Sequence, residues 1–431
     1  MTSFPENSLR FESGKNNLTH RINPRNGDRI SLLGFGAMRL PMLPGAPLPS
    51  GPEVDEAAAM ALMDRAYQEG VNYFDTAWPY HQGVSEVVVG KTLKKYPRNS
   101  FNLTDKMPSF LNPDRKKAEE IFQTQLERCR TEYFDYYLCH SLMSRENFVN
   151  VYERDGVLDF LMEQKKQGRI RNLGWSFHGD METLDYVLGC GADWDVGQLQ
   201  LNYHDVLHRY VPNIWNTQFL TREAAQPARA LERLAEAKIP VIVMEPLLGG
   251  RLGGQTRRAA EILRAARPEA SVAFWAFRFA AGLPNVLCVL SGMNQVGHLG
   301  DNLHSYSPYE PLTDEDKAVL QKSLDVFVSQ EHVPCTGCGY CVPCPADINI
   351  PGVFKLYNRA VDDDYVPPAA RPRERERDFG PAYDRELGEI GKSADCLKCG
   401  ACQDHCPQGI AVPDRMDQIR TFAEKLNILS K

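Results

Sequence analysis

The sequence predicts an α/β chain in which a (β/α)8 TIM barrel is followed by a small, cysteine-rich helical domain. Between residues 30 and 310, short apolar runs alternate with helical patterns, which is typical of βα units around a parallel sheet. Eight such units over about 280 residues match a (β/α)8 barrel in number and length. Eight of the twelve cysteines follow residue 330, so we expect a barrel domain at 1–328 and a second domain at 329–431.

The expected barrel strands are short and apolar. Val241–Met244 is a continuous apolar run, the composition of a strand that is covered on both faces. The strands are expected at Leu32–Met38, Tyr73–Asp75, Phe101–Lys106, Tyr136–His140, Arg171–Ser176, Gly197–Gln200, Pro240–Met244 and Val286–Leu290. A doubly wound open sheet is the competing fold, but it would normally carry G-x-G-x-x-G after its first strand. This chain offers only Gly34-Phe35-Gly36 there.

Helical patterns and turn signals separate these strands. The stretch 55–68 is rich in Ala, Met and Leu and is followed by a glycine, which is a helix-stop signal. The stretch 113–129 carries an apolar face at helical spacing, and Asn112 is its expected N-cap. Ahead of the barrel, Asn26-Gly27 lies between two short extended runs, which predicts a hairpin.

Composition and charge exclude several classes of protein. The chain has 431 residues, a formal charge of −7 and a pI of about 5.9; because it has no long basic run, we expect no nucleic-acid partner. It has no stretch of about 18 apolar residues, so we expect no membrane partner. The segment Met1–Arg10 is polar and lacks the apolar core of a signal peptide, which predicts a cytoplasmic protein with reduced cysteines. The charged stretch Val361–Gly380 is expected to be a solvated connector.

The cysteines after residue 330 form two tight groups. They are Cys335-x2-Cys338-x2-Cys341-x2-Cys344-Pro345 and Cys396-x2-Cys399-x2-Cys402-x3-Cys406-Pro407. Two-residue spacing lets three thiolates reach one [4Fe–4S] cluster, and the fourth cysteine, before proline, usually serves the other cluster of a pair. The expected ligand sets are Cys335, Cys338, Cys341 with Cys406, and Cys396, Cys399, Cys402 with Cys344. Zinc is the alternative, although four thiolates already saturate a zinc ion.

Four polar residues fall at or just beyond the carboxyl ends of three consecutive strands, where the active residues of such barrels lie. They are Asp75 and Tyr80 after the second strand, Lys106 at the end of the third and His140 at the end of the fourth. Each alone has an ordinary structural explanation, but together they suit carbonyl reduction. Tyr80 is expected to act as the acid, and the ammonium of Lys106 to lower its pKa from about 10. The Asp75 carboxylate should balance the charge of the Lys106 ammonium, and His140 should orient the carbonyl oxygen.

Longer motifs surround these four residues. They are Gly70-Val71-Asn72-Tyr73-Phe74-Asp75-Thr76-Ala77 with Tyr80 and Ser85-Glu86, then Asp135-Tyr136-Tyr137-Leu138-Cys139-His140, and Gly168-Arg169-Ile170-Arg171-Asn172-Leu173-Gly174-Trp175-Ser176. With Lys106 between them, they resemble the aldo-keto reductase family over residues 30–310. The whole chain is similar to the subgroup with a C-terminal ferredoxin-like 4Fe–4S domain. The resemblance implies a TIM barrel, an Asp/Tyr/Lys/His tetrad and NADP or NAD lying across the rim without a Rossmann fold.

The resemblance also implies which residues contact the nucleotide. Ser176 and Gln200 would hold the carboxamide, and Met244 would pack on the nicotinamide. Leu247, Gly249 and Arg251 match the pyrophosphate loop, Ser291, Gly292 and Met293 match the adenosine-phosphate loop, and Asn302 matches the adenine contact. Gly292, Met293 and His298 stand where the family commonly grips a 2′-phosphate. The sequence therefore does not support a preference for NADP over NAD, and NAD fits as well.

These features predict an NAD(P)H-dependent oxidoreductase that interconverts a carbonyl, an aldehyde, ketone or sugar, with an alcohol. A hydride carries two electrons and a cluster moves one at a time, so the clusters would serve a ferredoxin or flavoprotein partner or a structural role. The alternative is an electron-transfer or redox-sensing module that binds nucleotide with little turnover. A radical SAM enzyme would need a C-x3-C-x2-C triplet near the barrel, which this chain lacks.

Overall fold

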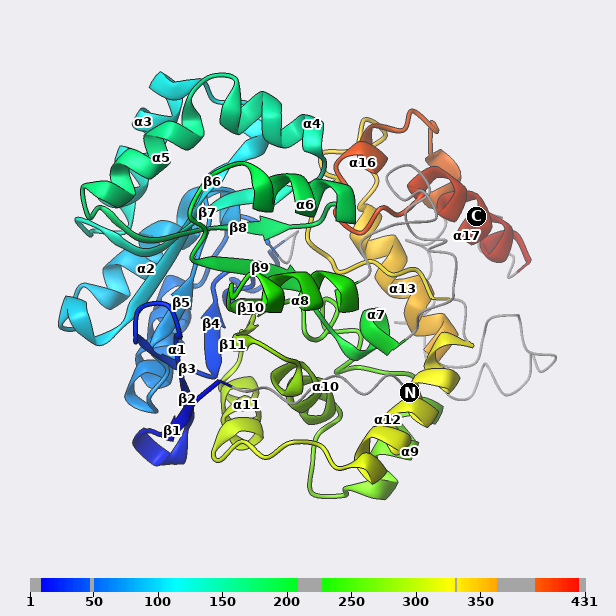
Figure 1. The fold of residues 1–431 in the computed structure, drawn as a ribbon. Coiled ribbons are helices and arrows are strands. Elements are labelled where there is room, and N and C mark those ends of the chain that lie inside the picture. The colour runs from blue at the N-terminus through cyan, green and yellow to red at the C-terminus, as the bar shows by residue number, and fades with distance from the viewer. Residues whose placement is uncertain (1–8, 47–49, 208–226, 330–331, 363–391, 426–431) are drawn as a thin grey trace. The chain divides into compact units, whose positions relative to one another are not determined.

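The computed structural model describes residues 9–46, 50–207, 227–329, 332–362 and 392–425 (Figure 1). These residues form two compact units. The first contains 9–207, 227–246 and 273–312, and the second contains 247–272 and the described residues from 313 onward. The predicted connector Val361–Gly380 lies outside the described residues from position 363 on. No described helix is long and apolar enough to cross a membrane.

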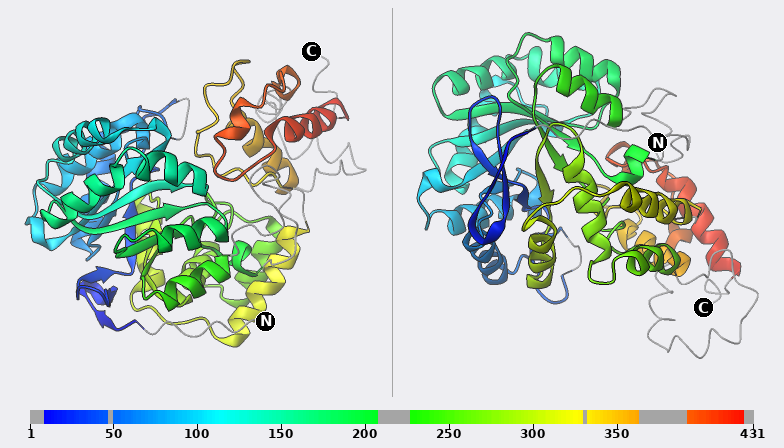
Figure 2. Two further views of the ribbon diagram at one scale, coloured as in Figure 1. Left: turned by 45° about the horizontal axis from the view of Figure 1, so that its top comes forward. Right: turned by 60° about the horizontal axis from the view of Figure 1, so that its bottom comes forward.

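Eight parallel strands close into a barrel in the first unit, as predicted (Figures 1 and 2). The ring runs β4-β5-β6-β7-β8-β9-β10-β11 and back to β4. The strands are β4 (Leu33–Gly36), β5 (Tyr73–Asp75), β6 (Asn102–Pro108), β7 (Phe134–Leu142), β8 (Ile170–Phe177), β9 (Val196–Gln200), β10 (Val241–Met244) and β11 (Val286–Ser291). Because every neighbouring pair is parallel, all eight carboxyl ends meet at one rim.

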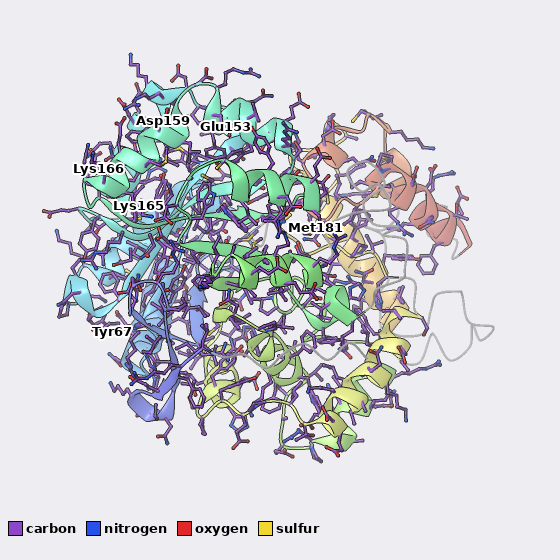
Figure 3. All side chains as sticks on the ribbon, in the orientation of Figure 1. Tyr67, Glu153, Asp159, Lys165, Lys166 and Met181 are labelled. Atoms are coloured by element: carbon purple, nitrogen blue, oxygen red, sulfur yellow. The ribbon has the colours of Figure 1, made fainter. Side chains whose placement is uncertain are left out.

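Helices cover the outside of the barrel. They are α1 (Glu56–Gln68), α2 (Val84–Leu93), α3 (Arg115–Arg128), α4 (Arg145–Phe148), α5 (Val157–Lys166), α6 (Met181–Gly189), α7 (Tyr203–Leu207), α8 (Pro227–Glu236), α10 (Val272–Gly282) and α11 (Val296–Tyr306). Figure 3 shows charged side chains of α5, among them Asp159 and Lys166, on the outer side of the helix. Leu161 of the same helix is fully buried, as expected of an amphipathic helix against a sheet.

Two local predictions differ in their outcome. The hairpin is confirmed: β2 (Thr19–Ile22) and β3 (Arg29–Ser31) pair antiparallel, and β1 (Phe11–Ser13) adds a third strand. The expected cap of α3 is wrong. The side chain of Asp114, not Asn112, accepts the hydrogen bond from the Lys117 N–H, because Asn112 lies two residues earlier, where it ends the preceding turn in a left-handed conformation.

The second unit contains the cysteine-rich segment and two helices that precede it. Helix α9 (Arg257–Ala266) packs on α12 (Asp314–Val328), and Arg267 forms a two-pronged ion pair with Asp316 at 2.9 and 2.7 Å. Further on, α13 (Ile350–Asp362) and α17 (Val412–Lys425) share an apolar core against which six of the clustered cysteines pack. The compact units thus place α9 and α12 with the cysteines, whereas the predicted boundary at 328/329 joins them to the barrel.

Candidate active site and cysteine groups

Three neighbouring strands and the loop after one of them place the four predicted tetrad residues at the carboxyl rim of the barrel. Asp75 is the last residue of β5 and pairs in register with Thr104 of β6, so that Lys106, two residues further, faces the same side. Pro108 of β6 pairs with His140 of β7. Tyr80 begins the short helical turn η2 (Tyr80–Gly83) in the loop after β5. The structure therefore brings all four residues together, as the strand-end argument predicted.

The Lys106 ammonium is the centre of this group. Its Nζ donates to Asp75 Oδ1 at 2.7 Å, to the Thr76 carbonyl at 2.7 Å and to Tyr80 Oη at 3.3 Å. These three bonds use the three N–H groups that an ammonium carries. The Lys106 side chain is fully buried, and Asp75 is 3% exposed. The second Asp75 oxygen accepts from Gln198 Nε2 at 3.0 Å, so the buried pair is both charge-matched and hydrogen-bonded.

The pKa of Tyr80 moves opposite to the prediction. Burial raises it well above its ordinary value, and the nearby carboxylates of Asp75 and Glu245 raise it further. The expected net lowering of the Tyr80 pKa is therefore wrong for the protein chain, because desolvation and negative charge outweigh the cations around the phenol. The phenol consequently holds its proton throughout the neutral range, with Lys106 placed to stabilise the oxygen when the proton leaves.

His140 is held neutral beside the phenol. Its ring lies 6.2 Å from the Tyr80 ring, edge to face. Burial lowers the pKa of His140 well below its ordinary value, and the charges of Lys106 and His178 lower it further. Within the described part of the chain, Nδ1 of His140 is buried and has no hydrogen-bond partner. A neutral imidazole with spare hydrogen-bonding capacity suits a group that orients a substrate oxygen.

The two cysteine groups come together in the second unit. All twelve cysteines are free thiols. Burial raises the pKa of Cys335 to about 12, and the neighbouring Cys338 and Cys406 raise it too. Burial also raises the pKa of Cys402 to about 11, with contributions from Cys396, Cys344 and Cys399. These neighbours belong to the same predicted ligand set as the thiol that they influence, and each time the last cysteine of the other group is among them; Cys341 is influenced by Cys335, Cys338 and Cys406 of its own set and also by Cys402 of the other.

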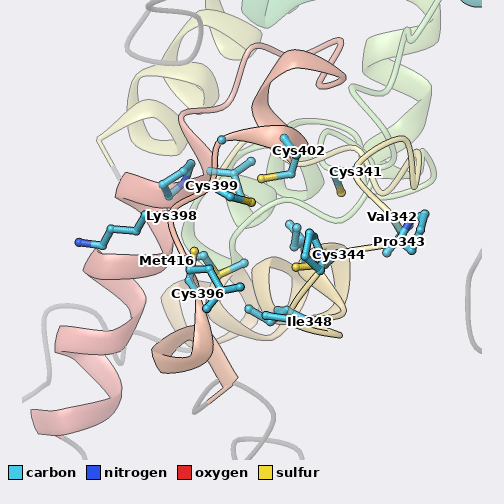
Figure 4. Close-up of a pocket in the computed structure, with 18 of the residues that line it drawn as sticks. Cys341, Val342, Pro343, Cys344, Ile348, Cys396, Lys398, Cys399, Cys402 and Met416 are labelled. Carbon is cyan, nitrogen blue, oxygen red and sulfur yellow. The ribbon is translucent and has the colours of Figure 1, made fainter.

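A pocket of about 330 Å³ lies between the second set and Cys341 of the first set (Figure 4). Its walls include Cys341, Cys344, Cys396, Cys399 and Cys402. Among the described residues, no three His, Cys, Asp or Glu side chains converge on a point as the ligands of one metal ion would. The thiols that line the pocket are of the kind that holds iron–sulfur clusters, whose irons each take a cysteine.

Comparisons with known proteins agree with both parts. Residues 32–325 match the model of the Aldo/keto reductase family, and residues 334–411 match that of the 4Fe-4S dicluster domain. The chain belongs to the aldo/keto reductase family. Its C-terminal part is an iron–sulfur domain, which confirms the resemblance seen in the sequence.

Relatives and solved structures show how far this likeness extends. A "Probable aldo-keto reductase 1" of Glycine max is 30% identical over 158 residues, which are 35% of this chain and only 42% of that protein. An uncharacterized oxidoreductase of Bacillus subtilis (strain 168) is 22% identical over 70% of this chain and 95% of its own length. The holo form of an aldo-keto reductase from Bacillus halodurans has a TM-score of 0.53 at 22% identity, covering 71% of this chain and 96% of that one. An aldo-keto reductase from Klebsiella pneumoniae "in complex with NADPH" has a TM-score of 0.53 at 18% identity, covering 70% and 93%. At such identities the structures confirm the (β/α)8 fold.

The residues that the family resemblance predicts to contact the nucleotide belong partly to the first unit and partly to the second. In the first unit, Ser176 Oγ is buried and accepts from the Ser141 N–H at 2.8 Å, and Gln200 Nε2 donates to Asp205 at 3.0 Å. Asn302 Nδ2 donates to Ser291 Oγ at 2.7 Å. Ser176, Gln200 and Ser291 lie at the carboxyl ends of β8, β9 and β11, and Met244 ends β10. The exposed Gly292 and the buried Met293 follow β11 directly, and Asn302 lies in the next helix, α11.

The predicted pyrophosphate loop belongs to the second unit. Leu247 accepts from the N–H groups of Gly250 and Leu252, and Gly249 has a φ of 70°. A Cβ on Gly249 would lie 2.4 Å from the backbone of Thr336, which follows Cys335, the first cysteine of the first group. The glycine predicted for close approach to a nucleotide therefore has a packing reason of its own.

Sequence reasoning missed several groups around the aldo/keto reductase tetrad. Glu245 follows β10 directly, and its Oε1 accepts from Arg39 Nη1 at 3.2 Å. His178 follows β8, and burial lowers its pKa to about 4 while the charge of Glu245 opposes the shift. The signal that identified Asp75, a polar residue just after an apolar strand, would have identified Glu245 and His178 as well.

Proposed function

We propose that the protein is an NAD(P)H-dependent oxidoreductase that interconverts an aldehyde or ketone, including a sugar carbonyl, with the corresponding alcohol. The observation that carries the proposal is the hydrogen-bonded chain from Asp75 through Lys106 to Tyr80 beside a neutral His140. Membership in the aldo/keto reductase family supports it, and the similar structure from Klebsiella pneumoniae is a complex with NADPH.

In this proposal a bound nicotinamide supplies the hydride, and Ser176, Gln200 and Met244 are the residues that would hold its ring. The chain supplies the proton: Tyr80 Oη donates to the substrate oxygen as negative charge develops there. The ammonium of Lys106, 3.3 Å from that oxygen, stabilises the phenolate left behind. Asp75 keeps the ammonium charge-balanced in a buried site, and His140 directs an N–H to the substrate oxygen.

The iron–sulfur domain adds one-electron chemistry to this proposal. We assign two [4Fe–4S] clusters, held by Cys335, Cys338, Cys341 with Cys406, and by Cys396, Cys399, Cys402 with Cys344. The crossed arrangement is supported by the thiol neighbours that influence Cys335 and Cys402. Such clusters would exchange electrons with a ferredoxin or flavoprotein partner. A barrel domain at 1–328 and a cluster domain at 329–431 remain our functional division of the chain.

Replacing the phenol by Tyr80→Phe tests the proposal. Loss of the proton donor should reduce carbonyl reduction by NADH or NADPH by about 10²–10⁴-fold, while calorimetric titration of anaerobically purified protein shows nucleotide affinity nearly unchanged. Tyr96→Phe, which removes a phenol that donates to Asp64 on the barrel's outer surface, is the control and should retain activity. Full activity in Tyr80→Phe would remove Tyr80 as the acid. Absence of turnover in the unaltered protein, with reversible bleaching of its clusters, would favour the redox-sensing alternative.

A further inference from the structure

The loop that follows β10 belongs to the same compact unit as the two cysteine groups. Residues 247–272 lie in the second unit, together with the described residues from 313 onward. Turn hydrogen bonds close the loop, and in one of them the Arg251 N–H donates to the Leu248 carbonyl at 3.3 Å. The cation of Arg251 is therefore carried by a hydrogen-bonded turn within the unit that contains the cysteines.

Two side-chain contacts attach this loop to α12. The Arg251 guanidinium lies over the Phe327 ring, 5.3 Å from its centre, a distance at which an aromatic face attracts a cation. One helical turn earlier in α12, Ser323 Oγ donates to Gln255 Oε1 at 2.9 Å, and both residues are buried. Because positions 323 and 327 share one face of the helix, the two contacts fix the loop along that face.

The same loop meets the chain on both sides of Cys335. On one side, the Phe327 ring stacks with the ring of His332, with 5.4 Å between the ring centres and 22° between the planes, and His332 lies three residues before Cys335. On the other side, a Cβ on Gly249 would lie 2.4 Å from the Cα of Thr336, the residue after Cys335. The loop thus brings Arg251 to the first cysteine group.

The charge of Arg251 acts on the Cys335 sulfur. Burial raises the pKa of Cys335 and neighbouring thiols raise it further, whereas the charge of Arg251 acts to lower it. The Gly337 N–H also donates to Cys335 Sγ, at 3.4 Å. A guanidinium and an N–H group both stabilise negative charge on a sulfur, so the surroundings of Cys335 favour electron density there.

The second cysteine group has a cation within its own motif, but that cation is directed away from the sulfurs. Lys398 lies between Cys396 and Cys399 in the sequence, and its ammonium pairs with the carboxylate of Asp417. The Lys398 side chain is 57% exposed, and Figure 4 shows it extending away from the labelled cysteines. Water and salt screen an exposed, paired charge strongly, so Lys398 should have little influence on this group.

This difference between the two groups bears on the reduction potentials of iron–sulfur clusters, which depend on nearby charge and on hydrogen bonds to the sulfurs. Reduction by one electron adds negative charge to a cluster held by thiolates, so a nearby cation favours the reduced form. We propose that Arg251 raises the reduction potential of the cluster expected on the ligand set of Cys335 and leaves that of the other cluster nearly unchanged. This inference rests on the two-cluster assignment in the proposed function.

The inference gives Arg251 a different role from the one that the family resemblance implies. The resemblance places Arg251 at the pyrophosphate of the nucleotide, whereas the contacts above connect it with α12 and with the segment around Cys335. A selective shift of one potential changes the difference between the two clusters, and that difference sets the direction in which an electron prefers to move between them. Arg251 would thus influence the electron-transfer part of the protein rather than its hydride chemistry.

The test is a redox titration of the full, anaerobically purified chain with dithionite and mediators, in which EPR reports the reduced clusters. Arg251→Gln removes the charge and Arg251→Lys keeps it. Lys398→Gln is the matched control, because it removes a cation from the motif of the second group. Cys399→Ser alters one expected ligand of the second cluster, so the EPR component that it changes or removes belongs to that cluster.

We expect Arg251→Gln to lower the ratio of reduced to oxidised first cluster at least tenfold at a fixed solution potential. For one electron, a tenfold change corresponds to a shift of about 59 mV, here toward more negative potential. The ratio for the second cluster should change less than threefold. Arg251→Lys should recover most of the loss because it keeps the charge, and Lys398→Gln should change either ratio less than threefold.

Three results would overturn the inference while the proposed function stands. Unchanged ratios in Arg251→Gln would show that the charge does not act on the cluster. Equal shifts of both components, or a shift of the second component alone, would show that the effect is not selective for the set of Cys335. Unchanged potentials with weaker calorimetric binding of NADH and ADP-ribose would place Arg251 at the pyrophosphate instead.

Iron content, measured first, separates a charge effect from a packing effect. Iron loss in Arg251→Gln but not in Arg251→Lys would support the inference, because only the charge differs in kind between these variants. Iron loss in both would mark Arg251 as a packing residue and overturn the inference. Absence of two cluster components from the unaltered protein would overturn the inference together with the two-cluster assignment, whereas carbonyl reduction by the same sample would show that the hydride chemistry stands.

Discussion

The barrel rim and the cysteine groups reach electrostatic balance in opposite ways. At the rim, the chain supplies both signs of charge: the buried Lys106 ammonium meets the Asp75 carboxylate at 2.7 Å. In the cysteine groups, burial and neighbouring thiols raise the pKa of Cys335 to about 12 and of Cys402 to about 11, so that burial there favours neutral thiols. The rim is therefore preorganised by the chain's own charges, whereas we expect the cysteine region to depend on what it binds.

The largest expected effect follows from removing the iron. Metal-binding free energy contributes directly to folding where the ligands are not otherwise held together. Chelation of iron under reducing conditions should therefore abolish amide protection in α13 and α17, while β5, β6 and β7 remain protected. Hydrogen exchange with mass spectrometry reads both regions in one sample. Unchanged protection of α13 and α17 after complete iron loss would show that their apolar core is enough to keep them folded without metal.

The barrel rim, in contrast, should be destabilised when one of its own charged side chains is removed. Lys106→Met leaves the Asp75 carboxylate buried with Gln198 as its remaining donor, and breaking a buried pair in this way costs about 3–5 kcal/mol. The free energy of opening, measured by hydrogen exchange in β6 and β7, should fall by that amount. Asp75→Asn added to Lys106→Met should restore part of the loss, since no unpaired charge then remains. A double variant as unstable as the single one would contradict this account.

How much of this could be predicted from sequence depends on whether the signal is local. Strand ends are local, so β5 was predicted to the residue and the rim positions of Asp75 and His140 followed. The iron–sulfur domain was also predictable, because the spacing of its cysteines is a local pattern; the two ligand sets stay a prediction. Glu245 likewise follows the apolar run of β10, so the same strand-end rule extends to it.

Other features depend on contacts between distant segments and left no local signal. The Arg39–Glu245 pair joins residues that are 206 positions apart, and no spacing rule links them. The direction of the Tyr80 pKa depends on how deeply the phenol is buried and on carboxylates from other strands. The sequence can predict that an ammonium lies beside the Tyr80 phenol. Only the packing shows that desolvation raises the pKa of the phenol by more than the ammonium lowers it.

A smaller effect is expected in the loop that packs on the first cysteine group. Gly249→Ala would place a Cβ 2.4 Å from the Thr336 backbone at a φ of 70°, whereas Gly250→Ala meets nothing within 4 Å at a φ of 97°. The left-handed backbone costs each variant about 1–2 kcal/mol, and overpacking should cost Gly249→Ala about 1–3 kcal/mol more. The rate at which chelator bleaches the cluster absorbance should rise more in Gly249→Ala. Equal rates in the two variants would mean that the Thr336 contact does not hold the cysteine group.

The smallest effect concerns two carboxyl groups buried behind the rim. Glu86 of α2 and Asp105 of β6 are fully buried, and Gln125 Nε2 donates to both, at 3.1 and 2.8 Å. Arg128 pairs with Glu86 at 2.7 Å. Burial raises the pKa of Asp105 well above its ordinary value, and the charge of Glu86 raises it further. Folding therefore favours the protonated form of Asp105 relative to the unfolded chain.

The sign of the pH dependence follows from that shift. A carboxyl whose folded pKa exceeds its unfolded value of about 3.9 stabilises the fold fully below that value and loses the contribution as pH rises through the folded pKa. Asp105→Asn mimics the protonated form, so it should be tolerated, and its stability should fall less steeply than that of the unaltered protein as pH rises above that unfolded value. The difference should be on the order of 1 kcal/mol, the size of one hydrogen bond, measured by hydrogen exchange of β6 as the pH is raised. Parallel pH profiles would mean that folding does not raise the pKa of Asp105, contrary to what its burial and the nearby Glu86 predict.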